Sequence, residues 1–319
     1  SQLLIYKYFA AKFLKSNNWL FLGNKENYNN LRKNLSLNSD IDLSISLIEN
    51  LNNYKSNSNI YGLIIDSNET ALLYSKSFQD QALFEEIIVL KKWYEIYLQQ
   101  IPSQLITGTE IINGEFNIKT ERLMIHLKRM FDIIFSLILL IVTFPLLIVI
   151  SMLIFFEDKG TILYAQKRTG LNGKVFKLLK LRSMSINAEN GGAKWSTKND
   201  PRVTKIGKFI RRVRIDELPQ LISVIKGDMS LIGPRPERPE FNISLSEKID
   251  NYELRHTIRP GLSGWAQVNY PYGASLEDAK QKLSYDLYYL KNYSILIDIL
   301  IFFRTIKLVL NVRGSEPIS

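Results

Sequence analysis

An adjacent pair of carboxylates, Asp216 and Glu217, is the feature of the sequence best suited to chemistry. The pair follows the basic stretch "RVTKIGKFIRRVR" at 202–214, and Arg235 stands soon afterwards between two prolines. Arginine can grip a phosphate with a bidentate fork, and carboxylates within so basic a field often hold a divalent cation. A carboxylate can also attack phosphorus and form an acyl phosphate, which divides a transfer into two steps. These residue types therefore predict phosphate chemistry.

The chain has no cysteine and only two histidines. This composition excludes disulfides and thiolate catalysis, and it disfavours zinc sites built from Cys or His. Mg²⁺ instead prefers one or two carboxylates together with phosphates and water, so Asp216 and Glu217 are the predicted Mg²⁺ ligands. The predicted phosphate- and substrate-binding residues, which share a positive charge and lie near this pair or in neighbouring basic segments, are Lys180, Arg182, Arg211, Arg214 and Arg235.

Helical signals place the acidic pair at the start of a helix. Pro219, which a helix tolerates only in its first turn, follows the pair, and Gly227 is the predicted stop. Asp216 is therefore the predicted N-cap and Glu217 the first helical residue. The helix dipole and the nearby arginines favour the ionised form of both carboxylates. An ordinary helix cap with surface ion pairs is the structural alternative, and such a cap contributes about 0.5–2 kcal/mol.

The longest apolar segment, residues 133–156, contains no charged residue and is long enough to cross a bilayer as a straight helix. Pro145 near its middle predicts a kink. Basic residues flank the segment on both sides, at 119–129 and at 159–182, and such residues prefer the cytoplasmic face of a membrane. A bend at Pro145 would leave two arms that are each too short to cross. A re-entrant hairpin is therefore favoured over the straight span.

The regions on either side of this segment are expected to be folded α/β structure. In residues 1–118 the stretches 18–23 and 60–66 are predicted to be buried strands, and 85–100 a helix, which together indicate a Rossmann-like domain. No dinucleotide is predicted, because the glycine spacing that admits a pyrophosphate is absent there. Near the other end, residues 294–310 are apolar but interrupted by charges, which suits a helix in the membrane interface or a buried core helix.

The formal net charge of +10 and the pI near 9.4 indicate an anionic partner. Nucleic acid, a phosphorylated small molecule and an anionic membrane surface all meet that description. Nucleic-acid binding is disfavoured, because the cations surround glycines, prolines and carboxylates and lack stacking platforms or a groove-reading helix. The sequence begins with Ser and shows no signal peptide, so natural upstream sequence is expected to be missing.

From about residue 128 to 310 the sequence resembles the bacterial sugar transferase family, the monotopic polyprenyl-phosphate phosphoglycosyl transferases. The resemblance lies in five ordered blocks: "KRMFD" (128–132), "QKRTGLNGKVFKLLKLRSM" (166–184), "DPRVTKIGKFIRRVRIDELPQL" (200–221), "KGDMSLIGPRPE" (226–237) and "RPGLSGWAQVNYPYGAS" (259–275). The tail at 277–294 is similar to that of larger members that make exopolysaccharide. Those members also have a Rossmann-like domain and, before it, transmembrane helices that this chain lacks.

The resemblance implies transfer of a sugar 1-phosphate from a UDP-sugar to polyprenyl (undecaprenyl) phosphate, with release of UMP and initiation of exopolysaccharide or related glycan synthesis. In the family's scheme Asp216 would be the nucleophile that carries the phosphosugar, and Glu217 would help to hold Mg²⁺. Arg211 and Arg235 match the family's phosphate-binding arginines. The family commonly has Ser before the hairpin proline; here Phe144 takes that place and Thr143 precedes it.

The full prediction is an α/β protein with three regions: a Rossmann-like accessory domain (1–118), a basic pre-membrane helix with a re-entrant hairpin (119–157), and a small α/β catalytic domain with interfacial amphipathic helices (158–319). The expected location is the bacterial inner membrane, with the catalytic domain on the cytoplasmic face. The expected partners are the UDP-sugar, the polyprenyl phosphate and the bilayer, and no nucleic acid; a homo-oligomer is left open. The alternative is a membrane-anchored, catalytically inactive scaffold or regulatory protein.

Overall fold

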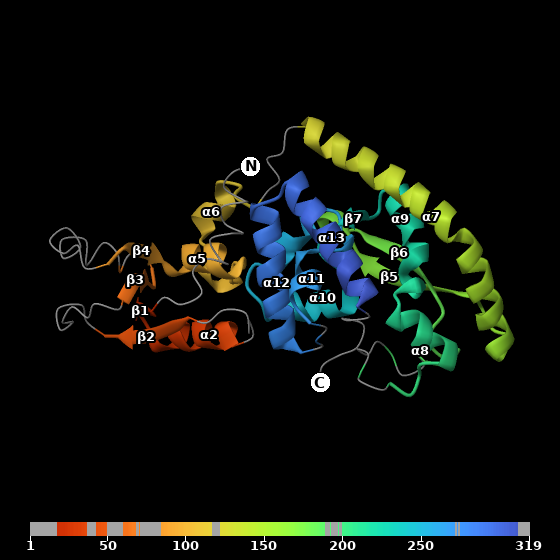
Figure 1. The fold of residues 1–319 in the computed structure, drawn as a ribbon, viewed down its shortest axis with the longest axis horizontal. Helices are drawn as coiled ribbons and strands as arrows, with labels where there is room; N and C mark the ends of the chain where they lie inside the picture. The colour runs from red at the N-terminus through yellow and green to blue at the C-terminus, as the bar shows by residue number, and fades with distance from the viewer. Residues whose placement is uncertain are drawn as a thin grey trace. The chain divides into compact units, whose positions relative to one another are not determined.

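The computed structural model describes residues 18–36, 43–49, 60–67, 70, 84–116, 122–188, 192, 197, 200–271, 273 and 275–311 (Figure 1). Contacts divide the chain into two compact units, Ser1–Ile101 and Pro102–Ser319. This division falls before the predicted boundary at 118, because the segment after Ile101 packs on the second unit. Asn251 donates to the carbonyl of Ser103 at 3.2 Å, and Phe116 is fully buried. Residues 119–121 of the predicted pre-membrane helix lie outside the described residues.

The first unit is built on a parallel sheet with the strand order β2-β1-β3-β4. The predicted strands at 18–23 and 60–66 are confirmed as β1 (Asn18–Leu22) and β3 (Ile60–Ile65). Each strand is a nearly continuous buried run, as expected where both faces of a parallel sheet are covered. The other regular elements of this unit are α2 (Lys25–Ser36), β2 (Ser44–Ile48), β4 (Glu86–Val89), α5 (Leu90–Trp93) and the π-helix η2 (Tyr94–Leu98).

The prediction of one helix over 85–100 is wrong in its first part. Glu86–Val89 is strand β4, which pairs with β3 in parallel, and helical structure begins only at Leu90. A short apolar run such as "EIIV" fits either a strand or a buried helix, so its state is decided by the sheet edge beside it. The remainder is helical and buries Trp93 and Tyr97 against Trp19 of β1.

The second unit combines one long apolar helix with two small sheets and a set of shorter helices. Strands β5 and β6 form an antiparallel pair, and β7 and β8 a short parallel pair. Its elements are η3 (Ser103–Leu105), α6 (Gly108–Ile112), α7 (Arg122–Asp158), β5 (Leu163–Thr169), η4 (Leu171–Gly173), β6 (Val175–Leu181), α8 (Lys205–Arg212), η5 (Ile215–Gln220), α9 (Leu221–Lys226), β7 (Ser230–Ile232), α10 (Pro239–Ser246), η6 (Tyr252–His256), β8 (Gly261–Ser263), α11 (Trp265–Asn269), α12 (Leu276–Lys291) and α13 (Ile295–Leu310).

Helix α7 contains the predicted membrane segment, and it continues through Pro145 without an interruption. The expected division into two separate arms is therefore not observed; Figure 1 shows one curved helix. The Thr143 hydroxyl donates to the carbonyl of Leu139 at 2.7 Å. A Thr bond to the carbonyl four residues earlier satisfies that group within the helix and commonly bends it. Phe144 occupies the position where the family commonly has serine before the proline. The hydroxyl that bonds to a backbone carbonyl here comes instead from Thr143, one residue earlier.

Most of the middle of α7 is exposed apolar surface, including Ile141 and Val142, which are 72% and 70% exposed. Over Ile125–Asp158 it is the one helix in the described part of the chain that is long and apolar enough to cross a membrane. Its two ends, in contrast, are held by the second unit. Near the first end Arg129 donates to the carbonyls of Val224 and Ile225 of α9, at 2.5 and 2.7 Å.

At the other end of α7, Ile150 and Ile154 are buried in a cluster with Leu181 of β6 and Ile210 of α8. Both ends of the apolar helix therefore contact one compact unit.

For residues 294–310 the sequence allowed either a helix in the membrane interface or a buried core helix. Helix α13 has features of both. Ile297 and Ile301 are fully buried, and Asp298 accepts from Lys128 of α7 at 2.7 Å. The opposite face is apolar and exposed, and it contacts the exposed apolar face of α7 through the rings of Phe302 and Phe135, 6.3 Å apart. One edge is therefore core, while the other face suits a membrane interface.

Candidate active site

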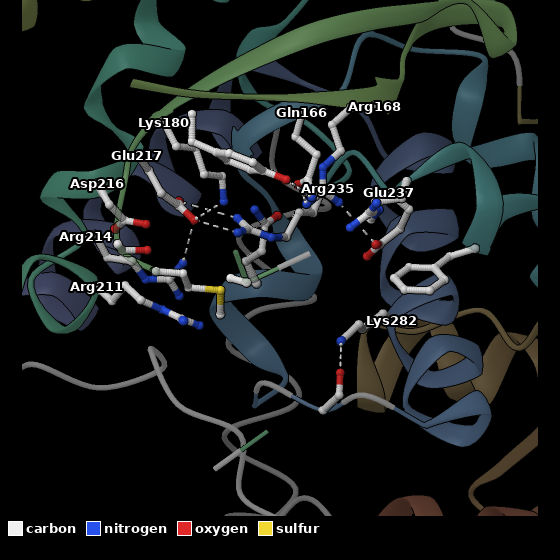
Figure 2. Close-up of a pocket in the computed structure, with 18 of the residues that line it drawn as sticks. Gln166, Arg168, Lys180, Arg211, Arg214, Asp216, Glu217, Arg235, Glu237 and Lys282 are labelled. Atoms are coloured by element: carbon white, nitrogen blue, oxygen red, sulfur yellow. Dashed lines mark hydrogen bonds and ion pairs between the residues drawn. The ribbon is translucent and has the colours of Figure 1, made fainter. Parts of the chain in front are cut away.

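A cavity of about 340 Å³ in the second unit brings together the residues that the sequence singled out (Figure 2). One wall is the β5–β6 hairpin, another is the turn between α8 and η5, and a third comes from the loop before α10 and from α12. Its lining includes all seven residues predicted for catalysis, substrate binding or metal binding: Lys180, Arg182, Arg211, Arg214, Asp216, Glu217 and Arg235. Residues separated by more than 50 positions in the chain thus share one space.

A tight turn at Arg214 aims the acidic pair into this cavity. Arg214 adopts the left-handed conformation, with φ 61° and ψ 16°, and reverses the chain after α8. The next residues form the 3₁₀-helix η5, in which Asp216 is the second residue. The prediction of Asp216 as N-cap is therefore wrong, since the helix begins at Ile215, two residues before the predicted first helical residue Glu217, and no side chain caps it. In an α-helix the ring of Pro219 would clash with the carbonyl of Ile215, four residues earlier, which disfavours an α-helix at this point.

The predicted end of this helical stretch is confirmed. The chain continues from η5 into α9, and Gly227 follows with φ 96°, the left-handed conformation that only glycine adopts easily.

Three cations surround the carboxylate of Glu217. Arg235 Nη2 donates to its Oε1 at 2.5 Å, while Lys180 Nζ and Arg214 Nη1 each lie 3.5 Å from the same oxygen. Burial raises the pKa of Glu217, but the combined charges of Arg235, Lys180 and Arg214 outweigh it and hold this pKa well below its usual range. Glu217 is thus a fixed negative charge.

Asp216 behaves in the opposite way. It is 6% exposed, and burial, together with the adjacent negative charge of Glu217, raises its pKa to about 6 against the opposing charges of Lys180, Arg211 and Arg214. The prediction that its surroundings favour the ionised form is therefore wrong in direction. The packing of η5 against β6 removes water from Asp216, and burial outweighs the arginines. Its Oδ1 is buried and, within the part of the chain that the structure describes, has no hydrogen-bond partner.

Lys180 of β6 lies 3.5 Å from the Glu217 carboxylate and is also affected by the charge of Asp216. Burial lowers its pKa to about 8 although Glu217 and Asp216 act to raise it. The ammonium therefore remains largely protonated at neutral pH and is poorly hydrated. A cation in such surroundings interacts strongly with any anion that enters.

Arg182 lines the same cavity but differs from the other cations in its contacts. Its side chain is 7% exposed, donates to the carbonyl of Ile154 at 3.3 Å and forms an ion pair with Asp158. Both partners belong to the end of α7. These described contacts attach β6 to the end of α7. Substrate binding by Arg182 stays a prediction.

The structure adds several residues that the sequence did not single out. Glu237 lines the cavity two positions after Arg235, and Arg168 Nη1 lies 3.6 Å from its carboxylate. A buried ion pair joins Arg255 to Asp286 at 2.9 Å, and Arg255 also donates to the backbone carbonyl of Arg235 at 2.9 Å. The position of Glu237 directly after the Pro-Arg-Pro element could have identified it from the sequence. Nothing in the sequence indicated the Arg255–Asp286 pair, because its members come from the distant segments η6 and α12.

The donor set of the cavity fits Mg²⁺ better than a metal held by protein ligands alone. In the described residues no cluster of three or more His, Cys, Asp or Glu side chains could hold a metal. Mg²⁺ needs only one or two carboxylates, because phosphate and water complete its shell. Asp216 Oδ1 is an acceptor without a described partner, and Glu217 retains lone-pair capacity beside its cation contacts. Asp216 and Glu217 are therefore suitable ligands.

Comparison with known proteins points to the same region of the chain. A family model described as "Bacterial sugar transferase" matches residues 123–312, which include α7 from its second residue onward and the whole cavity. The UDP-N-acetylgalactosamine-undecaprenyl-phosphate N-acetylgalactosaminephosphotransferase of Aeromonas hydrophila is 44% identical over 190 residues, 60% of this chain and 45% of that protein. The UDP-glucose:undecaprenyl-phosphate glucose-1-phosphate transferase of Escherichia coli (strain K12) is 39% identical over 182 residues, 56% of this chain and 39% of that protein.

A shorter relative matches more closely over a smaller stretch. A protein of Bacillus subtilis (strain 168), named as a putative undecaprenyl-phosphate N-acetylgalactosaminyl 1-phosphate transferase, is 56% identical over 129 residues, 40% of this chain and 72% of that protein. The aligned part of the chain spans less than half the length of the Aeromonas and Escherichia proteins.

Proposed function

Because the chain belongs to the bacterial sugar transferase family, we propose that it transfers a sugar 1-phosphate from a UDP-sugar to a polyprenyl phosphate such as undecaprenyl phosphate, and releases UMP. The relatives named above carry out or are named for reactions of this class. The observation that supports the proposal most is Asp216 itself. It is a buried carboxylate whose pKa is raised and whose Oδ1 has no described partner, and it lies in a cavity lined by arginines and a lysine.

In the first step a carboxylate oxygen of Asp216 attacks the phosphorus that bears the sugar. A new oxygen–phosphorus bond forms, and the bond from this phosphorus to the bridging oxygen of the diphosphate breaks. UMP leaves with the bonding electrons, and the sugar phosphate stays on Asp216 as an acyl phosphate. At neutral pH a carboxyl with a pKa of about 6 is mostly ionised, so no separate base is needed to activate it.

In the second step a phosphate oxygen of the lipid acceptor attacks the same phosphorus. The acyl phosphate bond breaks, Asp216 is regenerated as a carboxylate, and the product is a polyprenyl diphosphate sugar. The two steps use one nucleophilic residue and one site, so donor and acceptor phosphates occupy the basic cavity in turn.

The basic residues and Glu217 prepare the site for these phosphates. Lys180, Arg211, Arg214 and Arg235 provide positive charge fixed in position, which stabilises negative charge on the phosphoryl oxygens without reorganisation. Glu217 holds Arg235, Lys180 and Arg214 together by its own contacts. Mg²⁺, when bound by Asp216 and Glu217, would supply further neutralisation of the phosphoryl oxygens.

We also propose that α7 enters and leaves the same leaflet, as a re-entrant element, with the cavity on the cytoplasmic face of the bacterial inner membrane. A helix that crosses a bilayer places its ends about 30 Å apart on opposite sides of the hydrocarbon core. Both ends of α7 instead contact the second unit, at α9 and at the β6–α8 cluster, while its middle exposes apolar side chains. The curvature of α7 supports this arrangement (Figure 1).

For the first unit we propose a Rossmann-like accessory domain. Its strand order β2-β1-β3-β4 matches the beginning of the flavodoxin-like doubly wound order.

The experiment that tests the proposed reaction is a screen of UDP-sugars with purified protein, undecaprenyl phosphate and Mg²⁺, in which UMP release and lipid product are both measured. The expected result, with at least one UDP-sugar, is sustained UMP release beyond one UMP per protein that requires the lipid, together with formation of the lipid product. Asp216→Asn is the inactive control. The alternative of an inactive scaffold predicts binding of UDP-sugar without UMP release.

A further inference from the structure

The cavity continues beyond Arg235 to a second carboxylate, Glu237, which differs from Glu217 in its contacts (Figure 2). Glu217 is held by three cations, one of them at 2.5 Å. Glu237 has a single ion-pair contact among the described residues, with Arg168 at 3.6 Å, and its carboxylate forms no hydrogen bond there. Its side chain is 22% exposed and lines the cavity. An acceptor is therefore available for a ligand at this end.

The backbone that carries Glu237 is fixed although its carboxylate is not. The Thr169 N–H donates to the carbonyl of Glu237 at 2.9 Å, and Arg168 Nη1 donates to the carbonyl of Pro236 at 3.1 Å. On the other side of the loop, Arg255 donates to the carbonyl of Arg235 at 2.9 Å. A loop held from β5 and from η6 presents its acceptor in a prepared position, which lowers the entropic cost of binding a ligand.

Arg255 is itself held in place by two further side chains. It pairs with Asp286 of α12 at 2.9 Å, where the two side chains are 6% and 2% exposed, and it donates to the Tyr252 hydroxyl at 2.7 Å. Both residues of this pair line the cavity, so the wall that supports the loop of Arg235 carries a buried ion pair.

Glu237 lies close along the chain to a residue suited to hold the donor phosphate. The Cα atoms of Arg235 and Glu237, two residues apart, are separated by at most about 7 Å, and both residues line the cavity. A phosphate held at Arg235 would therefore leave its sugar, which is of similar size, room to extend toward Glu237.

The chemistry of this end suits a hexose better than the remainder of the donor. An ionised carboxylate accepts hydrogen bonds and repels phosphate, so the diphosphate belongs at the basic end. A hexose offers several hydroxyl donors, whereas a uracil ring offers a single N–H donor. Phe241, which lies four residues after Glu237 and also lines the cavity, provides an apolar ring for the C–H face of a sugar.

We propose that Glu237 binds the sugar of the donor by accepting hydrogen bonds from its ring hydroxyls, and thereby determines which UDP-hexose binds. This inference rests on the proposed function and assigns the sugar subsite within the same cavity. The Glu237 carboxylate is a charged acceptor in a partly enclosed site. Its removal should therefore weaken binding most for the UDP-sugar whose hydroxyls donate to it.

The test is calorimetric binding of UDP, UDP-glucose, UDP-galactose, UDP-N-acetylglucosamine and UDP-N-acetylgalactosamine to the purified full chain and to two variants. Glu237→Gln keeps the shape of the side chain and removes its charge. Glu240→Gln is the matched control, since Glu240 is a neighbouring glutamate that is 59% exposed and does not line the cavity. A melting curve of each variant in the same detergent establishes that it is folded.

The expected result is that Glu237→Gln weakens the preferred UDP-sugar by about 10- to 100-fold, the cost of one hydrogen bond to a charged acceptor. Its preference between epimeric sugars should shrink, its affinity for UDP should stay within twofold of the original, and Glu240→Gln should change none of these values. An equal loss for UDP, an unchanged sugar preference, or wild-type protein that binds no UDP-sugar more tightly than UDP would overturn the inference. Glu237-dependent binding of a UDP-sugar without any UMP release would leave the inference standing and refute the proposed reaction.

Discussion

The raised pKa of Asp216 predicts that the substitution that destroys the nucleophile also stabilises the fold. Asp216→Asn keeps the shape of the side chain and removes a charge that burial makes costly. If Asp216 were an ordinary helix cap, the same change would leave stability unchanged or lower it. The effect of one substitution on the free energy of unfolding therefore separates a carboxylate that is buried at a cost in stability from one that stabilises a helix end.

The size of the effect follows from linkage between protonation and folding. The pKa of Asp216 rises from 3.8 to about 6 in the folded chain, and each pKa unit corresponds to about 1.4 kcal/mol, so the ceiling is about 3 kcal/mol. The folded state holds more protons than the unfolded state between these two values, so stability falls as pH rises from about 4 to about 6. Above that range the full cost is present, and below it the cost vanishes. At pH 7.5 we expect Asp216→Asn to gain about 1–3 kcal/mol.

The measurement is thermal unfolding of wild type and variant in the same detergent, with EDTA to remove divalent cations, at pH 7.5 and near pH 4. For a unit of this size about 1 kcal/mol raises Tm by roughly 2–4 °C. Asp250→Asn is the control, because Asp250 is exposed and lies outside the cavity. A gain that is equal at both pH values, or a loss of stability at pH 7.5, would refute the burial argument.

Three further predictions concern the chemistry, the fold and the membrane helix. Since Asp216 must be ionised to attack, kcat/KM for UMP release should fall about tenfold per pH unit below about pH 6, and a rate that is flat from pH 5 to 8 contradicts this. Arg182→Ala removes the contacts with Asp158 and the end of α7, so it should lower the free energy of unfolding by roughly 3 kcal/mol. The KM for the UDP-sugar should stay within threefold of wild type. A much larger KM would show that Arg182 binds the phosphates instead. Because the chain has no cysteine, a single cysteine in Ile125→Cys or in Lys159→Cys reports on which side of the membrane that end of α7 lies. An impermeant maleimide should label both variants from the same side. Labelling from opposite sides would contradict the re-entrant proposal.

The parts of the fold that were predicted correctly depend on local sequence. Strands β1 and β3 are continuous apolar runs that end in polar turns, and Gly227 ends a helix because few other residues adopt its backbone conformation. The site residues were found for a similar reason. Arginine, lysine and paired carboxylates in one segment indicate phosphate chemistry wherever the chain places them, and the structure puts all seven in one cavity.

The parts that were missed depend on contacts between distant segments. Strand β4 was taken for a helix because only its pairing with β3 makes it a strand. The direction of the Asp216 pKa shift depends on how deeply η5 packs against β6, and the sequence shows the arginines but not that burial. The break expected at Pro145 is replaced by a continuous helix, in which Thr143 bonds to a nearby backbone carbonyl.

The central claim is that a carboxylate oxygen of Asp216 becomes bonded to phosphorus during turnover. The most direct measurement is mass spectrometry of peptides from protein incubated with its UDP-sugar and Mg²⁺ in the absence of polyprenyl phosphate. We expect a phosphosugar adduct on Asp216, one UMP released per adduct, and loss of the adduct when the lipid acceptor is added. Protein that turns over with the lipid but shows no such adduct on Asp216 would contradict it.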